Sequence, residues 1–154
     1  MKRIEICVGV LVLLGLSGSA FAQNPDAILG KWLNGKKTGQ VEIYKENGKY
    51  FGKLVWLKEP VYPASDKKGM AGQTKVDREN PDLSRRTQPL LGLVLLRDFD
   101  FVQDVLWERG KIYDPENGKD YRCKMTLTSP DVLRVRGFIG ISLIGRTEVW
   151  TRVK

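Results

Sequence analysis

The chain has 154 residues, enough for one domain that buries a single core. Its 26 lysine and arginine residues outnumber 18 aspartate and glutamate residues, which gives a net charge of +8 at pH 7. There is no histidine, so the commonest general base, the commonest metal ligand and the Ser-His and Cys-His nucleophile pairs are excluded. We therefore expect a binding protein rather than an enzyme, with no cofactor and no metal.

Residues 1–22 have the pattern of a secretory signal peptide. A basic start is followed by an uncharged apolar stretch (residues 6–16) and an Ala-x-Ala signal that ends at Ala22. The apolar stretch is too short for a membrane-spanning helix, which takes about 17–25 residues. We expect a single exported domain, residues 23–154, without a transmembrane segment. Export argues against a nucleic-acid partner, and the positive charge favours anionic lipids or cell-wall polymers, or serves solubility alone.

The remaining chain consists of short runs in which apolar and polar residues alternate with a period of two, as in β-strands. We expect strands at residues 31–34, 40–45, 49–57, 92–99, 105–113, 120–128, 131–139 and 146–153. Asn47-Gly48 supplies the positive φ of a tight hairpin. The pattern predicts an all-β fold, a single small antiparallel up-and-down β-barrel of about eight strands. Such a barrel is either filled by side chains or holds one small ligand.

The most polar segment, residues 110–125, raises the question of a metal loop or a catalytic loop. Counted from Asp114, a calcium loop would need glycine at its sixth position and glutamate at its twelfth. The sequence has its glycine one position early, and Met125 stands at the twelfth. Asp114-Pro115 and Asn117-Gly118 are strong turn formers. We interpret the segment as a hairpin corner with hydrated carboxylates.

A long connection, residues 58–89, separates the third and fourth strands and contains four prolines. Loops beyond about 12–15 residues in a compact domain are usually lids, binding loops or disordered. Asn80 followed by Pro81 predicts the start of a short helix. Two interpretations stay open, a solvated tether and a lid over one end of the barrel.

The last hairpin carries an uncharged stretch, residues 137–145, with four large aliphatic side chains. Such a tip either folds over the barrel end as a plug or stays exposed for lipid or a partner. We favour the plug, with residues 88–96 as the surface that it covers.

Several motifs together resemble one family of exported bacterial proteins, domain of unknown function 2147 (DUF2147). They are Gly30-x-Trp32, "GKYFGKLVWL", Asp77 with Asn80-Pro81, Arg86 with Pro89 and Gly92, "GKIYDPENGKDY" and "VRGFIGISLIGRTEVWTRV". The resemblance covers residues 27–153. It implies a small periplasmic or secreted protein of a Gram-negative bacterium, without an established activity.

A looser resemblance is to the calycins, which include lipocalins, fatty-acid-binding proteins and streptavidin-like barrels. These barrels begin with Gly-x-Trp, as Gly30 and Trp32 do here, and lipocalins pack a basic side chain from near the chain end over that tryptophan. Arg152 is the matching residue. The resemblance implies a cation–π contact of roughly 0.5–2 kcal/mol that joins the first and last strands, and we assign Trp32 and Arg152 structural roles.

The leading functional hypothesis is a barrel that binds a small, partly apolar ligand such as a fatty acid. Side chains expected to point inward are Tyr50, Leu54, Trp56, Tyr121, Cys123, Met125 and Leu127. The predicted ligand-binding residues are Tyr50, Trp56, Asp77, Arg86, Tyr113 and Arg136. Arg86 from the long connection, or Arg134 and Arg136 if their face points inward, would bind a ligand carboxylate; otherwise the strand arginines lie outside in water.

Two other hypotheses remain. The first is a filled barrel that contacts an envelope lipid or protein through residues 137–145 and its basic surface. The second is a carboxylate-based enzyme with Asp77, Glu79, Tyr113 and Asp114 as its actors, which requires at least two of them to converge in a cleft.

Overall fold

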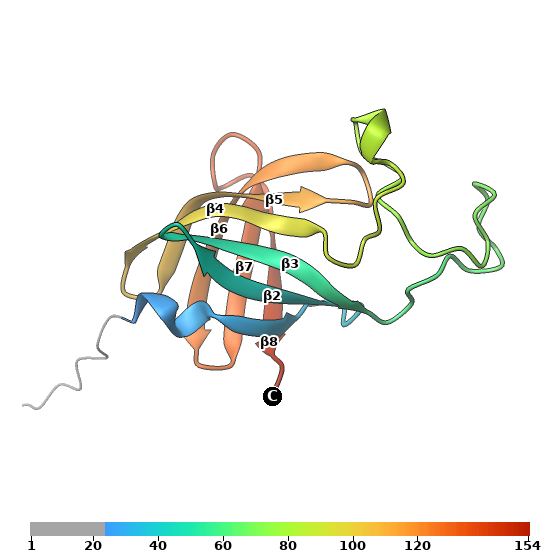
Figure 1. Cartoon of the computed structure of the whole chain (residues 1–154). Coiled ribbons are helices and arrows are strands. Elements are labelled where there is room, and N and C mark those ends of the chain that lie inside the picture. The colour runs from blue at the N-terminus through green and yellow to red at the C-terminus, as the bar shows by residue number, and fades with distance from the viewer. Residues whose placement is uncertain (1–23) are drawn as a thin grey trace, which may run out of the picture.

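The computed structural model describes residues 24–154, so the predicted signal peptide and its cleavage site after Ala22 lie outside the described residues. The elements are η1 (Pro25–Ile28), β1 (Gly30–Leu33), β2 (Gly39–Glu46), β3 (Lys49–Leu57), η2 (Leu83–Arg85), β4 (Val94–Gln103), β5 (Leu106–Asp114), β6 (Lys119–Ser129), β7 (Val132–Phe138) and β8 (Gly145–Arg152). Each strand pairs antiparallel with the next, and β8 pairs with β1 to close a barrel (Figure 1). The predicted all-β up-and-down barrel is confirmed.

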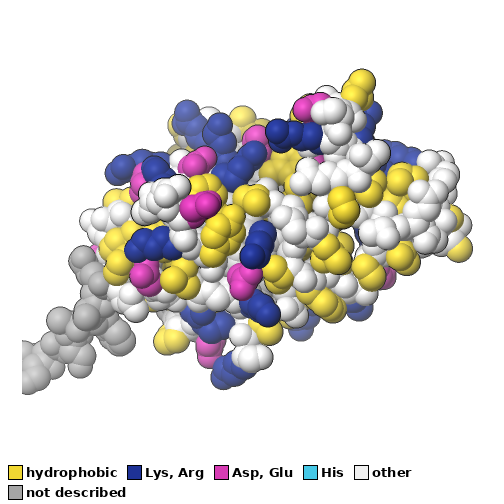
Figure 2. All heavy atoms as spheres, in the orientation of Figure 1, with side chains coloured by type: hydrophobic (Ala, Val, Ile, Leu, Met, Phe, Trp, Pro, Cys, Tyr) yellow, Lys and Arg dark blue, Asp and Glu magenta, His cyan; other side chains and the backbone are white. Residues whose placement is uncertain are grey.

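Side-chain alternation decides which face of each strand is inside. On β6, Cys123, Met125 and Leu127 are buried, and on β7 Leu133 and Val135 are buried, while the residues between them face outward. The outer face is charged, and Figure 2 shows lysine and arginine side chains spread over the visible surface. These strands therefore have the inward and outward faces that their sequence pattern predicts.

One end of the barrel is closed by large side chains and by η1. Trp32, Tyr50, Phe99 and Trp107 are almost fully buried there. The indole of Trp107 donates a hydrogen bond to the Pro25 carbonyl at 3.2 Å, which ties η1 to this end. Because the strands run alternately up and down, the β2–β3, β4–β5 and β6–β7 turns share this end.

Trp32 and Arg152 join the first and last strands, as expected. The Arg152 guanidinium lies 4.2 Å from the Trp32 ring centroid. It also donates hydrogen bonds to the carbonyl oxygens of Ala27, Leu29 and Pro130 at 2.7–2.8 Å. One side chain thus holds η1, the start of β1 and the β6–β7 turn together.

The connection between β3 and β4 is ordered rather than a free tether. Short bridges join Val61 to Thr74 and Val76 to Pro89. Within it, the side chain of Asp82, not Asn80, caps the 3₁₀ turn η2, so the predicted helix start is two residues early. Asn80 instead accepts a hydrogen bond from the Asp82 amide at 2.9 Å and holds the backbone that leads into η2.

The β7–β8 hairpin tip is not a plug, and that prediction is wrong. Its aliphatic side chains Ile139, Ile141, Leu143 and Ile144 are exposed by 60–85%. Two guanidinium groups hold the tip backbone: Arg136 donates to the carbonyls of Ser142 and Leu143, and Arg122 donates to that of Gly140. Within residues 24–154, the helical segments are all too short to cross a bilayer.

Candidate ligand cavity

A cavity of about 960 Å³ opens at the end of the barrel opposite η1. Four loops border its mouth: those between β1 and β2, β3 and β4, β5 and β6, and β7 and β8. Its wall is largely apolar and is formed by Val41, Leu54, Leu57, Leu95, Ile112, Val135 and Trp150. Small-ligand sites in proteins are typically apolar cavities of about 300–1,000 Å³ with a few polar groups, so the size and the lining both fit such a site.

Glycines at the inner face of the strands show why one half of the lumen is filled and the other is hollow. At Gly110, an added Cβ would lie 2.4 Å from the Phe99 ring, which occupies that space. At Gly52, it would lie 2.8 Å from Leu96. At Gly137, by contrast, the nearest atom is Ile112 Cγ2 at 3.4 Å, an ordinary contact, and Gly137 lines the cavity. Besides Ile112, the contact within 4 Å of an added Cβ at Gly137 is Tyr121 Cβ at 3.7 Å, so the space beside Gly137 is not crowded.

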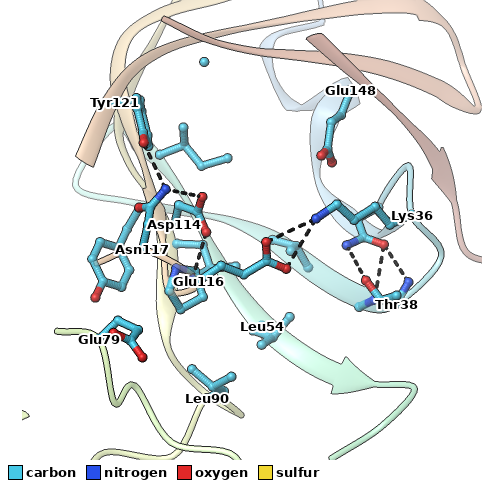
Figure 3. Close-up of a pocket in the computed structure, with 18 of the residues that line it drawn as sticks. Lys36, Thr38, Leu54, Glu79, Leu90, Asp114, Glu116, Asn117, Tyr121 and Glu148 are labelled. Atoms are coloured by element: carbon cyan, nitrogen blue, oxygen red, sulfur yellow. Dashed lines mark hydrogen bonds and ion pairs between the residues drawn. The ribbon is translucent and has the colours of Figure 1, made fainter. Parts of the chain in front are cut away.

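An ion pair spans the mouth. Lys36 on the β1–β2 loop lies 3.2 Å from Glu116 on the β5–β6 corner (Figure 3). Asn34 fixes the first loop, since its side-chain oxygen accepts hydrogen bonds from the amides of Thr38 and Gly39 at 2.8 and 3.2 Å. Both charged side chains of the pair are largely exposed, so the pair is weak in water.

The polar segment around Asp114 is a corner, as predicted from its turn residues. The Gly118 amide donates to the Asp114 carbonyl at 2.8 Å, and the Asp114 side chain accepts from the Glu116 amide at 2.9 Å. The corner also borders the cavity mouth, where Glu116, which is largely exposed, pairs with Lys36. The sequence pattern locates the turn but not what faces it across the barrel.

A carboxylate lies in the cavity wall. Glu148 on β8 points toward the space that Lys36, Glu116 and Tyr121 surround (Figure 3). It accepts a hydrogen bond from the Trp150 indole at 3.3 Å and lies 3.6 Å from the Arg146 guanidinium. Glu148 was missed as a site residue, although its place two residues before the buried Trp150 is a signal that it faces inward.

Of the predicted ligand-binding residues, the structure brings Asp77 and Tyr113 into contact and leaves the others apart. Tyr113 borders the cavity mouth. Tyr50 lies in the closed end, where its hydroxyl donates to Asp26 at 2.7 Å. Arg86 is exposed and donates to the Asn80 carbonyl at 2.8 Å, and Arg136 holds the β7–β8 tip from outside.

Trp56 is 40% exposed on the outer face, and the inward orientation predicted for it is wrong. The pairing of β2 with β3 contains a bulge between Gln40 and Val41, so that Leu57 rather than Trp56 faces Gly39 and the cavity. A bulge adds one residue and turns the following side chains to the opposite face.

Asp77 and Tyr113 form a buried pair at the outer side of the mouth. Asp77 is fully buried and accepts hydrogen bonds from the Tyr113 hydroxyl at 2.8 Å and from Asn80 at 2.6 Å. Burial and the hydrogen bond to Asp77 raise the pKa of Tyr113 well above its usual value. The tyrosine therefore stays protonated at neutral pH, and the pair anchors the β3–β4 segment to β5.

Burial raises the pKa of the Cys123 thiol to about 12, so it is protonated and inert at neutral pH. Within residues 24–154, no cluster of three carboxylates or thiols is placed to hold a metal ion.

The fold of the chain is similar to that of a known barrel. Protein HP1028 from the human pathogen Helicobacter pylori, described as belonging to the lipocalin family, superposes with a TM-score of 0.68 and 24% sequence identity over 82% of each chain. This likeness supports the lipocalin-like barrel and confirms the calycin resemblance. No curated protein sequence matches the chain. The model of the family described as "Uncharacterized protein conserved in bacteria (DUF2147)" matches residues 30–152, and the chain belongs to this family.

Proposed function

We propose that the protein binds one small, partly apolar ligand in the cavity at the open end of the barrel. The observation that carries the proposal is the apolar cavity of about 960 Å³ itself, which a filled barrel would not have. A hydrocarbon portion packs along Leu54, Ile112 and Val135, and a polar portion lies at the mouth. Burial of apolar surface supplies the binding energy, at roughly 25 cal/mol per Å² before the cost of ordering the ligand.

The mouth offers both charges to a polar head group. Lys36 and Glu116 can each exchange their mutual ion pair for a ligand group, and Glu148 accepts hydrogen bonds from hydroxyl or amine groups. Lys58 and Lys75 from the β3–β4 segment also border the mouth. An amphiphile such as a fatty acid or a lipid fragment matches this division of apolar wall and charged mouth.

The first test is native mass spectrometry of the protein purified without detergent from its own cells, followed by solvent extraction. We expect a discrete added mass, released on unfolding and matched by an extracted small molecule. The same instrument then measures binding of laurate as a probe, with one molecule expected per chain.

A matched pair of variants assigns the binding to the cavity. Gly137→Leu places a side chain in the cavity without a close contact at Cβ, and Arg134→Leu introduces the same residue on the outer face of β7. We expect laurate binding to fall at least about tenfold in the first variant and to stay unchanged in the second. A protein that carries no ligand and binds no laurate, or a Gly137→Leu variant that binds laurate as the wild type does, contradicts the proposal.

We further infer that the carrier works in the periplasm or outside the cell, because of the signal-peptide pattern of residues 1–22. Amino-terminal sequencing of the protein from separated cell fractions tests this inference. We expect an exported chain that begins at Gln23, and a cytoplasmic chain that begins at Met1 contradicts it.

A further inference from the structure

The β7–β8 hairpin ends in a cluster of exposed aliphatic side chains that no other part of the described chain covers. This apolar tip consists of Ile139, Ile141, Leu143 and Ile144, which are 69%, 60%, 85% and 68% exposed. Residues 139–144 contain no charged side chain. A contiguous apolar patch on a monomer costs solubility and usually marks a contact surface.

The tip keeps its shape without burying those side chains. Arg136 donates from Nε to the Ser142 carbonyl at 2.7 Å and from Nη2 to the Leu143 carbonyl at 3.2 Å. Arg122 donates to the Gly140 carbonyl at 3.4 Å. The guanidinium groups satisfy backbone acceptors of the loop, and they place positive charge directly behind the aliphatic side chains.

The tip stands at the cavity mouth. Ile139 and Ile144 are among the residues that border the cavity, together with Arg146 at the start of β8. Figure 1 shows the β7–β8 hairpin projecting beyond the barrel wall. Whatever surface the tip enters therefore lies next to the opening through which a ligand passes.

We propose that the apolar tip inserts into an anionic lipid surface and holds the cavity mouth against it, so that the ligand is a lipid-derived amphiphile exchanged with that surface. The part of this proposal that concerns the ligand rests on the function proposed above.

The composition of the tip favours lipid over a protein partner. Protein interfaces depend on tryptophan, tyrosine and arginine anchors that fill pockets, whereas the tip offers aliphatic side chains on a narrow loop. Arginine behind an apolar face and an excess of lysine and arginine over aspartate and glutamate complement anionic head groups.

The test uses residues 24–154, which contain the described strands of the closed barrel and the core that they enclose, and which lack the apolar amino-terminal stretch of the sequence that would itself bind lipid. Binding is measured by co-flotation with vesicles of phosphatidylglycerol and phosphatidylcholine, and with vesicles of phosphatidylcholine alone. The tip variant is Ile141→Ser with Leu143→Ser. The matched control, Val102→Ser with Val105→Ser, removes two exposed aliphatic side chains from the β4–β5 turn at the closed end.

We expect the wild type and the control to bind the anionic vesicles and the tip variant to bind at least about tenfold more weakly, because two inserted aliphatic side chains are lost. Added salt and vesicles of phosphatidylcholine alone should also weaken binding, since the guanidinium groups then lose their partners. Thermal unfolding checks that all three proteins are folded, as expected for substitutions of exposed side chains.

Three results would overturn the proposal: no binding of the wild type to anionic vesicles, equal binding of the tip variant, or a dimer in sedimentation that the tip variant abolishes while neither protein binds vesicles. The last result would assign the tip to a second copy of the chain. Gly137→Leu separates this inference from the proposed function, because blocking the cavity should leave vesicle binding intact. If the protein binds vesicles but carries no ligand, the insertion of the tip is supported, whereas the carrier function and the exchange of lipid are refuted.

Discussion

Trp32 is the residue on which the closed end of the barrel depends most directly. Its side chain is fully buried, its indole donates to the Ile28 carbonyl at 2.9 Å, and Arg152 covers one face of the ring. Trp32→Ala should lower the free energy of unfolding by about 3–5 kcal/mol, because the cavity left behind cannot collapse in a closed barrel. Urea unfolding measures the loss. Trp56→Ala is the control, with an expected loss below about 1.5 kcal/mol, since Trp56 is 40% exposed. Similar losses in the two variants would show that Trp32 is not an anchor.

Tyr113 makes a contribution to stability that depends on pH. Burial and the hydrogen bond to Asp77 raise the pKa of Tyr113 in the folded protein. Its contribution to stability is therefore complete below the ordinary tyrosine pKa of about 10. Above that pH the tyrosine ionises first in the unfolded chain, so the contribution declines as pH rises. Tyr113→Phe should lower stability by about 1–3 kcal/mol at pH 7, since the buried Asp77 loses a donor. The difference between wild type and variant should shrink as the pH of urea unfolding is raised from about 8 to about 11. A difference that is the same at all pH values would contradict the assigned shift.

Single residues also mark the limit of prediction from the sequence. The alternation of apolar and polar residues places Met125, Leu127 and Leu133 inside, because a regular strand has a period of two. It fails at Trp56, because the pairing with β2 skips Val55 and this bulge in β3 shifts the register by one residue. The same alternation places Glu148 on the inward face, but it was not predicted as a cavity residue because charged residues usually lie outside. Neither the bulge nor the opening of the lumen to water can be predicted from one strand alone, because both depend on the strands that pair with it.

Among the elements, the β3–β4 segment owes its position to the β5–β6 corner. Gly118 has a φ of +69°, and a Cβ at this position would lie 1.9 Å from the Glu79 carbonyl oxygen. The Asn117-Gly118 pair thus serves two purposes, the turn itself and a close approach by the segment. Together with the Asp77–Tyr113 pair, this contact fixes one border of the cavity mouth.

Gly118→Ala should detach the segment, because alanine strains the backbone and meets the Glu79 carbonyl. Limited trypsin digestion measures the effect, with cleavage at the exposed Lys67 and Lys68 expected to quicken about tenfold or more as local opening becomes easier. Gly48→Ala is the control, since it has a φ of +78° but no atom within 4 Å of the added Cβ. Equal digestion rates in the two variants would mean that backbone strain alone, and not the contact with Glu79, explains the effect.

The elements could be predicted from the sequence better than the contacts between them. Strand positions and the Asn47-Gly48 hairpin follow from local pattern and turn chemistry, and the structure confirms them. The positions of the β7–β8 tip and of the long β3–β4 segment could not be predicted, because they depend on contacts with residues distant in the sequence. The tip backbone accepts a hydrogen bond from Arg122 on β6, and the long segment is held in place by Tyr113 on β5.

At the scale of the whole molecule, the barrel is a filled half joined to a hollow half. Aromatic side chains fill the half that η1 covers, and the cavity occupies the half surrounded by the four loops. The sequence predicts the closed barrel but leaves open whether it is filled, since volume inside a barrel depends on all strands together. Gly137 illustrates this, because only its neighbours Ile112 and Tyr121 determine whether the space beside it is occupied.

The seam between β1 and β8 is the shortest strand pairing of the closed barrel, with the registered pairs Trp32–Arg152 and Leu33–Thr151. Arg152 compensates through its three hydrogen bonds to carbonyl oxygens on η1, the β1 start and the β6–β7 turn. Lysine keeps the charge but lacks the planar fork that reaches all three acceptors. Arg152→Lys should therefore cost about 2–3 kcal/mol, since hydrogen bonds to charged groups contribute about 1.5–3 kcal/mol and lysine retains part of the interaction.

Native-state hydrogen exchange shows whether this loss belongs to the seam. The Val153 amide, which donates to the Lys31 carbonyl at 2.9 Å across the seam, should exchange faster in Arg152→Lys than in the wild type. Amides in the long pairing of β5 with β6 should change only by the loss of global stability. Arg134→Lys, an exposed arginine on β7, is the matched control and should leave both regions unchanged. If the seam and the β5–β6 amides respond equally to Arg152→Lys, the barrel opens as one unit and Arg152 stabilises the whole fold rather than its closure. If the seam alone responds, opening there precedes global unfolding.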